Sequence, residues 1–349
     1  MSGGVDSSVV AGLMVRRGYD VIGVTMQIWQ ESQTDPRHSG CCSLGAVEDA
    51  RRVARILGIP YYVVNMKEEF RQTVIQDFLD EYSQGRTPNP CVQCNRFVKF
   101  DLLMKKAQEV GCDLLATGHY ARIRKSKASG NWHVQRARAK DKDQSYALYM
   151  LSQEQMERVR FPLGELHGKH ETREMAREMN LPVANKPDSQ EICFVGEAGG
   201  YGEFMKKNRP DSFAKGEVVD SAGNVLGKHD GVALYTVGQR KRIQVNSGRA
   251  LYVLKVEPST NRVVVGSDDQ LFHREVLFND VVGLTNGKSR VIGKIRYNME
   301  PVKATFVPGT TAKAVFDKPV RAVTPGQTAV FYRGESVVAG GTILGPGGN

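Results

Sequence analysis

The chain has 349 residues, of which 40% are hydrophobic and 25% charged, and its formal net charge is +10. This length exceeds one ordinary hydrophobic core and predicts about two or three domains. No apolar run approaches the ~20 residues of a membrane helix and no signal peptide opens the chain, which excludes those classes and favours a cytoplasmic protein. The positive charge favours a polyanionic partner such as nucleic acid, with a basic but ordinary enzyme as the alternative.

The first ten residues, MSGGVDSSVV, have the composition of a phosphate-binding loop that leads into a helix. Gly3 and Gly4 allow the backbone to approach a phosphate, and the following serines add hydroxyl donors. Asp6 is suited to hold Mg²⁺ or to orient the loop. The alternative is a plain glycine turn with helix-capping side chains. The loop is not a Walker A motif, because the GK[ST] ending is absent.

Residues 9–115 alternate between strand-like and helix-like segments, which predicts βαβ units on a parallel sheet. The strand-like runs are residues 20–26 (DVIGVTM), 60–65 (PYYVVN) and 112–118 (CDLLATG), and all three are expected to be buried. Apolar residues spaced three or four apart predict three core-facing helices between them. Their apolar positions are Val47, Ala50, Ala54 and Leu57; Phe70, Val74, Phe78 and Tyr82; and Phe97, Phe100, Leu103 and Ala107.

Beyond residue 201 the pattern changes to β-branched runs separated by glycine-rich turns. GEVVDSAGNVLG and LYVLKVEPSTNRVVVG predict hairpins. From about residue 275 onward, five or so short strands with evenly spaced turns predict a small β-barrel. An α/β region therefore precedes two β-rich regions.

The opening loop resembles the pyrophosphate-loop (PP-loop) signature of ATP pyrophosphatases. Six further sequence blocks narrow the function beyond that class. The remainder of the chain resembles the bacterial tRNA-specific 2-thiouridylase family (MnmA). The blocks that carry this second resemblance are TPNPCVQCNRFVKF (87–100), ATGHYAR (116–122), KDQSYALY (142–149), KPDSQEICFV (186–195), YTVGQRK (235–241) and IRYN (295–298).

The resemblance implies a fold in three parts. Residues 1–200 would form an α/β domain with a parallel sheet of the adenine nucleotide α-hydrolase (PP-loop) type, which binds ATP. Residues 201–273 would form a small central domain, and residues 274–349 a C-terminal β-barrel that binds tRNA. The implied activity is ATP-dependent 2-thiolation of the wobble uridine of Lys, Glu and Gln tRNAs, in which the C2 oxygen is adenylated and then replaced by sulfur.

Two cysteines carry this chemistry in the family. The resemblance maps the nucleophile to Cys94 and the persulfide carrier to Cys193. Because a thiolate is the reactive form, Arg96 and Lys99 would lower the pKa of Cys94 if the fold brings them close. A single cysteine is otherwise a small buried hydrophobe.

Cys91 leaves two routes of sulfur transfer open, because many relatives have Asp at this position whereas this chain has the sequence CVQC. Cys91, Cys94 and Cys193 could ligate a [4Fe–4S] cluster whose fourth iron holds the sulfide. Alternatively Cys91 is a spare thiol, and Cys94 and Cys193 alternate between persulfide and disulfide. Cys41 and Cys42 precede a predicted helix and are expected to have a structural or loop role.

The resemblance also implies contacts to ATP and tRNA. The ATP contacts are Ser2, Gly3, Gly4, Val5, Asp6, Ser7, Met26 and Gly118, with Mg²⁺ as the accompanying ion. The contacts to the target base are Asn89, Pro90 and Cys91, and the other tRNA contacts are Lys142, Asp143, Gln144, Arg296 and Tyr297. His119 is either a further contact or a structural residue. The sulfur donor is a cysteine desulfurase or a sulfur-relay protein, and the sequence does not decide between them.

One departure concerns the start of the chain. Relatives have a strand just before Met-Ser-Gly-Gly, and this chain begins at that Met. Either the start codon lies further upstream, which we favour, or the chain is truncated; as written, a weaker sheet and weaker ATP binding are expected. Two rival functions remain, a different PP-loop ligase that acts on a small carboxylate and a tRNA-binding protein without catalysis.

Overall fold

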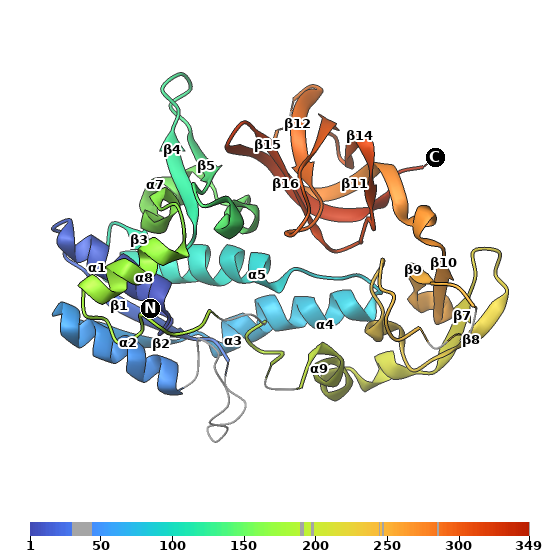
Figure 1. Cartoon of the computed structure of the whole chain (residues 1–349), viewed down its shortest axis with the longest axis horizontal. Coiled ribbons are helices and arrows are strands. Elements are labelled where there is room, and N and C mark those ends of the chain that lie inside the picture. Colours follow the sequence, from blue (N-terminus) through green and yellow to red (C-terminus); the bar gives the residue numbers. More distant parts are fainter. Residues whose placement is uncertain are drawn as a thin grey trace. The chain divides into compact units, whose positions relative to one another are not determined.

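The computed structural model describes residues 1–29, 44–188, 192–196, 199–243, 245, 248–284 and 286–348 (Figure 1). Cys41 and Cys42 lie outside these residues. The chain divides into two units, which are described separately below. Unit 1 comprises Met1–Val74, Cys91–Gly200 and Glu335–Val337, and unit 2 comprises Ile75–Pro90, Tyr201–Gly334 and Val338–Asn349.

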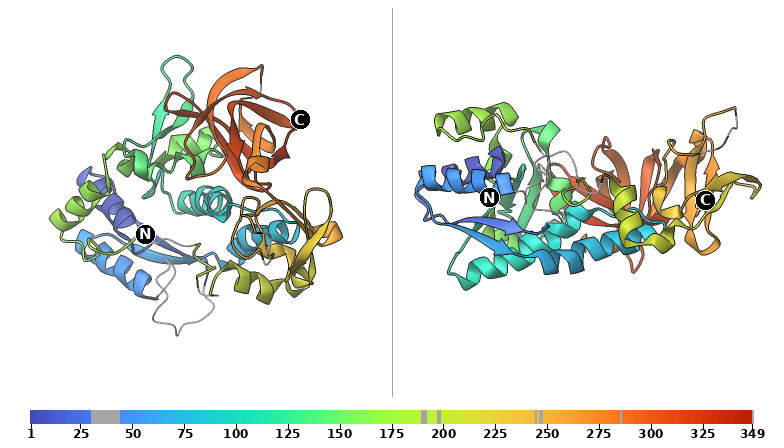
Figure 2. Two further views of the ribbon diagram at one scale, coloured as in Figure 1. Left: turned by 45° about the vertical axis from the view of Figure 1, so that its right-hand side comes forward. Right: turned by 90° about the horizontal axis from the view of Figure 1, so that it is seen from below.

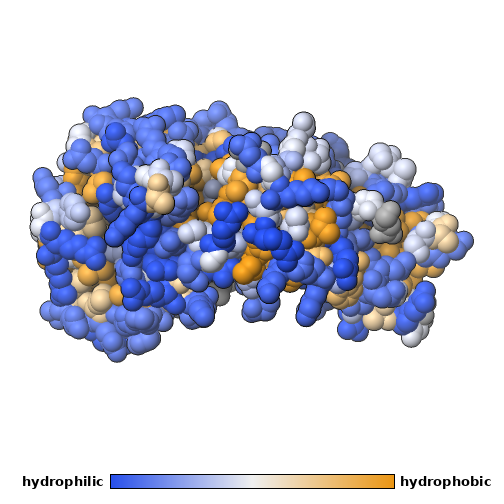
Figure 3. All heavy atoms as spheres, turned by 90° about the horizontal axis from the view of Figure 1, so that it is seen from above, coloured by the Kyte–Doolittle hydropathy of each residue, from blue (hydrophilic) through white to orange (hydrophobic). Residues whose placement is uncertain are grey.

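Hydrophilic residues dominate the face of the molecule shown in Figure 3, with hydrophobic residues in smaller groups between them. Among the described residues, none of the helices combines the length and the apolar character needed to cross a membrane.

Unit 1 is built on parallel strand pairs flanked by helices. Helix α1 (Val5–Arg16) is followed by β1 (Gly23–Gln27), α2 (Leu44–Leu57) and β2 (Tyr61–Asn65). β1 pairs in parallel with β2, and β3 (Leu115–Ala116) pairs in parallel with β6 (Val159–Arg160). Side chains of α1 and α2 share a core with α8 (Lys169–Glu178), and Figure 1 shows these three helices gathered near the β1–β2 pair.

The predicted parallel strands are confirmed in position, but two expectations about them need correction. The described strands form two separate parallel pairs, where one sheet was expected. The second strand is also not buried, since Tyr62 and Val63 are 59% and 40% exposed, and both residues of the third, β3, are only half-buried. Among the described strands β2 pairs with β1 alone, so its other edge is unpaired. Consecutive strand residues point to opposite faces, so the exposure of Tyr62 and Val63 means that neither face of β2 is fully covered.

The helices predicted between the strands are present, with wide π turns in two of them. One helical run comprises α3 (Lys67–Phe70), a π segment (Arg71–Ile75) and α4 (Gln76–Ser83). The other comprises α5 (Pro90–Gln93), a π segment (Cys94–Leu102) and α6 (Leu103–Glu109). Phe70, Val74, Phe78 and Phe100 are fully buried, which confirms the predicted apolar faces.

The rest of unit 1 places short elements around the second strand pair. β4 (Ala121–Lys125) and β5 (Trp132–Arg136) form an antiparallel hairpin. α7 (Gln153–Arg158) begins with a capping box in which Ser152 and Gln155 bond reciprocally. Single 3-10 turns complete the unit at Lys140–Lys142, Ser145–Leu148 and Pro162–Glu165.

The first part of unit 2 after residue 200 is a small sheet with one helix. α9 (Tyr201–Asn208) precedes a four-stranded sheet of order β8-β7-β10-β9. Its strands are β7 (Gly216–Val219), β8 (Val225–His229), β9 (Tyr252–Glu257) and β10 (Arg262–Gly266). Both predicted hairpins are confirmed, and 3-10 turns lie at Pro210–Phe213, Val232–Leu234, Pro258–Thr260 and Asp268–Leu271.

The predicted barrel is confirmed as a six-stranded closed barrel. Its strands run in the order β11-β14-β13-β12-β15-β16, and β16 pairs back to β11. The barrel is the orange and red part of the ribbon in Figure 2. They are β11 (Phe272–Gly283), β12 (Ser289–Lys294), β13 (Val302–Val307), β14 (Ala312–Arg321), β15 (Thr328–Arg333) and β16 (Ser336–Pro346). Phe331 lies at the centre, with Phe278 and Phe306 rings 5.4 and 5.0 Å from its own.

Candidate functional site

The opening loop has the geometry of an anion-binding turn. Gly3 has a φ of +67°, and a Cβ there would lie 2.2 Å from the carbonyl oxygen of Ala46, so no other residue fits. Gly4 caps α1, and its carbonyl oxygen accepts from Ser8 Oγ at 2.8 Å and from Ser7 Oγ at 3.3 Å. The first N–H groups of a helix have no partner within the helix, so the start of α1 presents donors to an anion.

Gly118 packs directly against this loop. A Cβ at Gly118 would lie 2.9 Å from Asp6 Cβ and 3.1 Å from the backbone nitrogen of Ser7. The turn after β3 therefore touches the loop backbone, as expected for a nucleotide site at the carboxyl ends of parallel strands. Met26 is half-buried in β1, opposite Val64 of β2.

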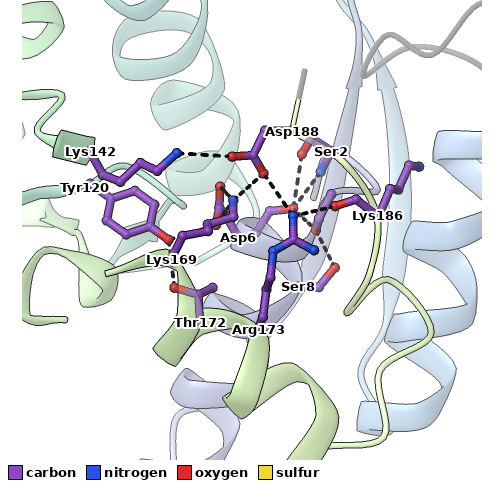
Figure 4. Close-up of polar contacts among 12 residues, drawn as sticks. Ser2, Asp6, Ser8, Tyr120, Lys142, Lys169, Thr172, Arg173, Lys186 and Asp188 are labelled. Carbon is purple, nitrogen blue, oxygen red and sulfur yellow. Dashed lines mark hydrogen bonds and ion pairs between the residues drawn. The ribbon is translucent and has the colours of Figure 1, made fainter. Parts of the chain in front are cut away.

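A polar cluster surrounds Asp6, and it brings together residues far apart in the sequence (Figure 4). We call Asp6, Lys142, Lys169, Arg173 and Asp188 the Lys169 cluster. Lys169 Nζ donates to both carboxylate oxygens of Asp6 at 2.8 Å and lies 2.6 Å from Asp188 Oδ1. Lys142 Nζ and Arg173 Nη2 lie 3.6 and 3.7 Å from the Asp188 carboxylate. The Lys169 side chain is 13% exposed, so this network is largely shielded from water.

Tyr120 and Thr172 extend the cluster on the buried side. Tyr120 Oη donates to Asp6 Oδ1 at 3.1 Å and lies 2.7 Å from Thr172 Oγ1. Burial, and then the charge of Asp6, raises the pKa of Tyr120, so its hydroxyl remains a donor. Burial alone would raise the pKa of Asp188, but the hydrogen bond and charge of Lys169, followed by the charges of Lys142 and Arg173, outweigh burial and lower it.

Sequence reasoning missed most of this cluster. Lys169 and Arg173 belong to no quoted block, Tyr120 lies in the ATGHYAR block where Gly118 was the expected ATP contact, and Asp188 lies in a block chosen for its cysteine. The sequence does place two of these residues close to expected site residues. Asp188 lies five residues before Cys193, and Tyr120 directly follows the ATGH turn that contains Gly118.

The expected tRNA contacts of unit 1 are tied into local structure. Lys142 faces Asp188, as described above. Asp143 accepts from the backbone nitrogens of Ala137 and Ser145 at 3.0 and 3.1 Å. Gln144 Oε1 accepts from the backbone nitrogen of Tyr120 at 3.0 Å. The turn that carries these three residues is thus fixed against the turn after β3, which packs on the opening loop.

Cys94 is the first residue of a π segment and is 8% exposed. Its neighbour Asn95 is buried, and Asn95 Nδ2 donates to the carbonyl oxygen of Ala147 at 2.9 Å while Lys99 Nζ donates to Asn95 Oδ1 at 3.0 Å. The Arg96 guanidinium lies 5.1 Å from the Phe97 ring centre. π turns often occur at functional sites, because they re-aim one side chain out of the regular helical pattern.

The three candidate cluster ligands differ in their surroundings. Cys91 is exposed in α5, Cys94 is buried, and Cys193 is half-buried in a turn. Phe194, next to Cys193, is fully buried with its ring 5.8 Å from that of Phe70. Within the described ranges, no group of three His, Cys, Asp or Glu side chains is placed to hold a metal ion. The residues present therefore do not fit the cluster ligand set.

His119 is enclosed by aromatic rings. Its Nδ1 lies 2.8 Å from Thr117 Oγ1, and the rings of Phe100 and Phe161 are each 5.7 Å away. Burial, and then the charge of Lys99, lowers the pKa of His119 well below its ordinary value. The lowered pKa favours the neutral imidazole of His119, the residue that directly follows Gly118.

In unit 2, the segment before Asn89 and Pro90 is held by the barrel. Gln327 Nε2 donates to the carbonyl oxygens of Thr87 and Pro88 at 3.0 and 3.1 Å. Elsewhere on the barrel, Arg296 and Tyr297 follow β12, and Tyr297 is 42% exposed with Lys294 Nζ 5.6 Å from its ring centre. An exposed aromatic ring beside cations is suited to nucleic acid.

Comparison with known proteins defines the class first. Residues 1–197 match the family model described as "tRNA methyl transferase HUP domain", residues 202–267 match "tRNA methyl transferase PRC-barrel domain", and residues 278–343 match "Aminomethyltransferase beta-barrel domain". The chain is thus a HUP-domain protein of the PP-loop type with two β domains.

Curated relatives then give the particular family. The chain is 48% identical to the tRNA-specific 2-thiouridylase MnmA of Clostridioides difficile, over 98% of this chain and 96% of that protein. It is 46% identical to the proteins of the same name from Acetivibrio thermocellus (98% and 97%) and Carboxydothermus hydrogenoformans (98% and 96%). The chain belongs to the tRNA-specific 2-thiouridylase family.

One solved structure, NMN synthetase from Francisella tularensis, is similar at 16% identity and a TM-score of 0.33, over 60% of this chain and 74% of that one.

Proposed function

We propose that this protein is an ATP-dependent tRNA-uridine 2-sulfurtransferase that converts the wobble uridine of Lys, Glu and Gln tRNAs to 2-thiouridine. The observation that carries the proposal is family membership along 98% of the chain, in a sequence that retains the phosphate loop, Cys94 and Cys193. The proposed activity requires the phosphate loop and the two cysteines to act on the same uridine of the tRNA.

The first step assigned to the phosphate loop is adenylation. The C2 oxygen of uridine attacks the α-phosphorus of ATP, the bond from that phosphorus to the bridging oxygen breaks, and pyrophosphate leaves with the electron pair. Residues Ser2 to Ser7 would bind the phosphates through backbone N–H groups and hydroxyls, and Met26 and Gly118 would contact the remainder of ATP. Asp6 is the loop carboxylate suited to hold Mg²⁺, which neutralises phosphate charge when bound.

The second step assigned to the cysteines is sulfur transfer. The terminal sulfur of a Cys193 persulfide attacks C2, and the C2–oxygen bond breaks so that AMP leaves with the oxygen. Cys94 then attacks Cys193 Sγ and forms a disulfide, and the electron pair of the broken S–S bond stays on the sulfur now bound to C2. An external thiol reductant restores both thiols for the next turnover.

The iron–sulfur route is the alternative, and the site does not favour it because the three cysteines do not fit the ligand set. Protein purified without oxygen would settle the matter. Full activity in colourless protein would support the persulfide route, whereas activity that follows a brown chromophore would support the cluster.

The tRNA contacts and the domain borders are part of the same proposal. Asn89, Pro90 and Cys91 would contact the flipped target base, and Lys142, Asp143 and Gln144 would contact the surrounding tRNA. Arg296 and Tyr297 would contact tRNA from the barrel. We place the catalytic domain at residues 1–200, the central domain at 201–273 and the barrel at 274–349. A cysteine desulfurase or a sulfur-relay protein would load Cys193.

Mass spectrometry of tRNA tests the proposal. The full chain is incubated without oxygen with tRNA, ATP and a sulfur source, and 2-thiouridine is measured beside tRNA affinity. Cys193→Ser is expected to abolish the product while tRNA binding is retained, and Cys112→Ser, a half-buried cysteine before β3, serves as the matched control. Adenylation of a small carboxylate in place of tRNA would favour another ligase, and tRNA binding without any product would favour a non-catalytic protein.

A further inference from the structure

The phosphate loop has a cation of its own that no motif assigns. Lys169 begins α8 and reaches Asp6, 163 residues earlier in the chain. An ammonium has three N–H donors, and the three closest acceptors here are both oxygens of Asp6 and one oxygen of Asp188. All of its donors are therefore used by carboxylates in this structure.

The position of Lys169 between Asp6 and Asp188 is expected if the loop binds phosphates. A carboxylate beside a polyanion is unfavourable unless a cation lies between them, and Asp6 lies two residues after Gly4 in the loop that approaches the anion. Lys169 Nζ is the cation in direct contact with Asp6. A phosphate oxygen can replace one oxygen of Asp6 as acceptor, and the ammonium then bridges loop, ligand and Asp188.

The other cations of the site are engaged away from the loop. Lys186 Nζ donates to Asp49 Oδ2 at 2.8 Å. Arg173 donates to the carbonyl oxygens of Ala184 and Lys186 at 2.8 and 3.0 Å. These two cations hold the surrounding segments, and Lys142 Nζ lies 3.6 Å from Asp188. Of the three cations in the cluster, Lys169 is the one that contacts Asp6 of the loop.

We propose that Lys169 is a phosphate-binding residue of the ATP site, and that it binds the pyrophosphate end of the nucleotide while Asp188 holds its side chain in place. This inference rests on the proposed use of ATP. The pyrophosphate end carries most of the negative charge of ATP, so an ammonium gains most there. Tyr120 supports the geometry by donating to the same Asp6 carboxylate.

Calorimetric titration with ATP, inorganic pyrophosphate and AMP tests the assignment. Lys169→Met is expected to weaken ATP and pyrophosphate binding about ten- to a hundredfold, the range for one charge-assisted hydrogen bond. AMP binding is expected to stay within about twofold by the same reasoning, since AMP lacks the contacted groups. Lys169→Arg, which keeps the charge, is expected to restore part of the loss. Arg177→Met removes the same charge from an exposed position on the same helix and is expected to match the wild type.

Lys169→Met leaves two carboxylates without their shared cation, so a second measurement uses the unaltered protein. Amine labelling of Lys169, followed by peptide mass spectrometry, is expected to slow with pyrophosphate and not with AMP. Equal ATP affinity in Lys169→Met, or labelling that pyrophosphate does not alter, would overturn the inference and leave Lys169 as a purely structural ion pair. Failure of the wild type itself to bind ATP would instead refute the proposed function.

Discussion

Replacing Gly118 with alanine should displace the phosphate loop by contact with a single methyl group. Gly118 is not in the left-handed region, so the change adds no backbone strain. The added Cβ would lie 2.9 Å from Asp6 Cβ, 3.1 Å from the Asp6 carbonyl carbon and 3.1 Å from Ser7 N. These are the start of a side chain and backbone atoms, so they cannot rotate away as the end of a flexible side chain can.

The magnitude follows from overpacking. An extra methyl group in a closely packed region costs about 1–3 kcal/mol, through backbone shifts and strained rotamers. We expect Gly118→Ala to lower the free energy of unfolding of unit 1 by about that amount. Because the strain falls on Asp6 and Ser7, ATP affinity should fall by about tenfold or more, as 1.4 kcal/mol corresponds to tenfold.

Urea unfolding and calorimetric ATP titration measure the two effects. Gly45→Ala is the matched control, because Gly45 lies in α2 with nothing within 4 Å of an added Cβ. Alanine there is expected to leave ATP affinity unchanged and to change the free energy of unfolding by no more than about 0.5 kcal/mol, as is usual for an exposed position. Gly118→Ala that binds ATP as tightly as the wild type would refute the close packing of the β3 turn on the loop.

Three further predictions concern tRNA binding, the barrel core and acid stability. Arg296→Ala should weaken tRNA binding and lower the slope of log affinity against log salt by about one, and an unchanged slope would remove Arg296 from the tRNA surface. Phe331→Ala, at a fully buried ring, should lower the free energy of unfolding of the barrel by about 3–5 kcal/mol in urea titrations, whereas Leu344→Ala, 44% exposed, should barely change it. The pKa of Asp188 is lowered in the folded protein, so its stabilising contribution is present above about pH 4 and is lost as the pH falls further. Asp188→Asn should therefore flatten the loss of stability below pH 4, and an acid unfolding curve identical to that of the wild type would contradict this.

Elements with strong local periodicity could be predicted from the sequence. The helix that carries Ala50 and Ala54, the two hairpins after residue 201 and the barrel strands all follow from apolar spacing and turn residues. The phosphate loop could be predicted because a glycine pair followed by Asp and two Ser is typical of a turn with a positive φ, which Gly3 has. Such features depend on neighbours in the sequence, which single-sequence reasoning can evaluate.

The misjudged features depend on tertiary partners. The sequence of β2 has the apolar composition of a buried strand, but its exposure is decided by which strands pair beside it. The apolar spacing around Cys94 predicts a regular helix, whereas the structure has a π segment that begins at Cys94. The wider π turn leaves little trace in apolar spacing, so the sequence does not reveal it. The ion pairs of Lys169 join three segments that only the fold brings together.

The charges of the Lys169 cluster fit the ligand that the site is proposed to take. Two carboxylates and three cations leave the cluster with one positive charge, and both carboxylates already have a cation in contact. An incoming triphosphate therefore meets no uncompensated negative charge, although Asp6 lies within the loop itself. Because the same ammonium contacts Asp6 in the loop and Asp188 in the block that carries Cys193, a phosphate bound to Lys169 would change the electrostatic surroundings of both steps of the reaction at once.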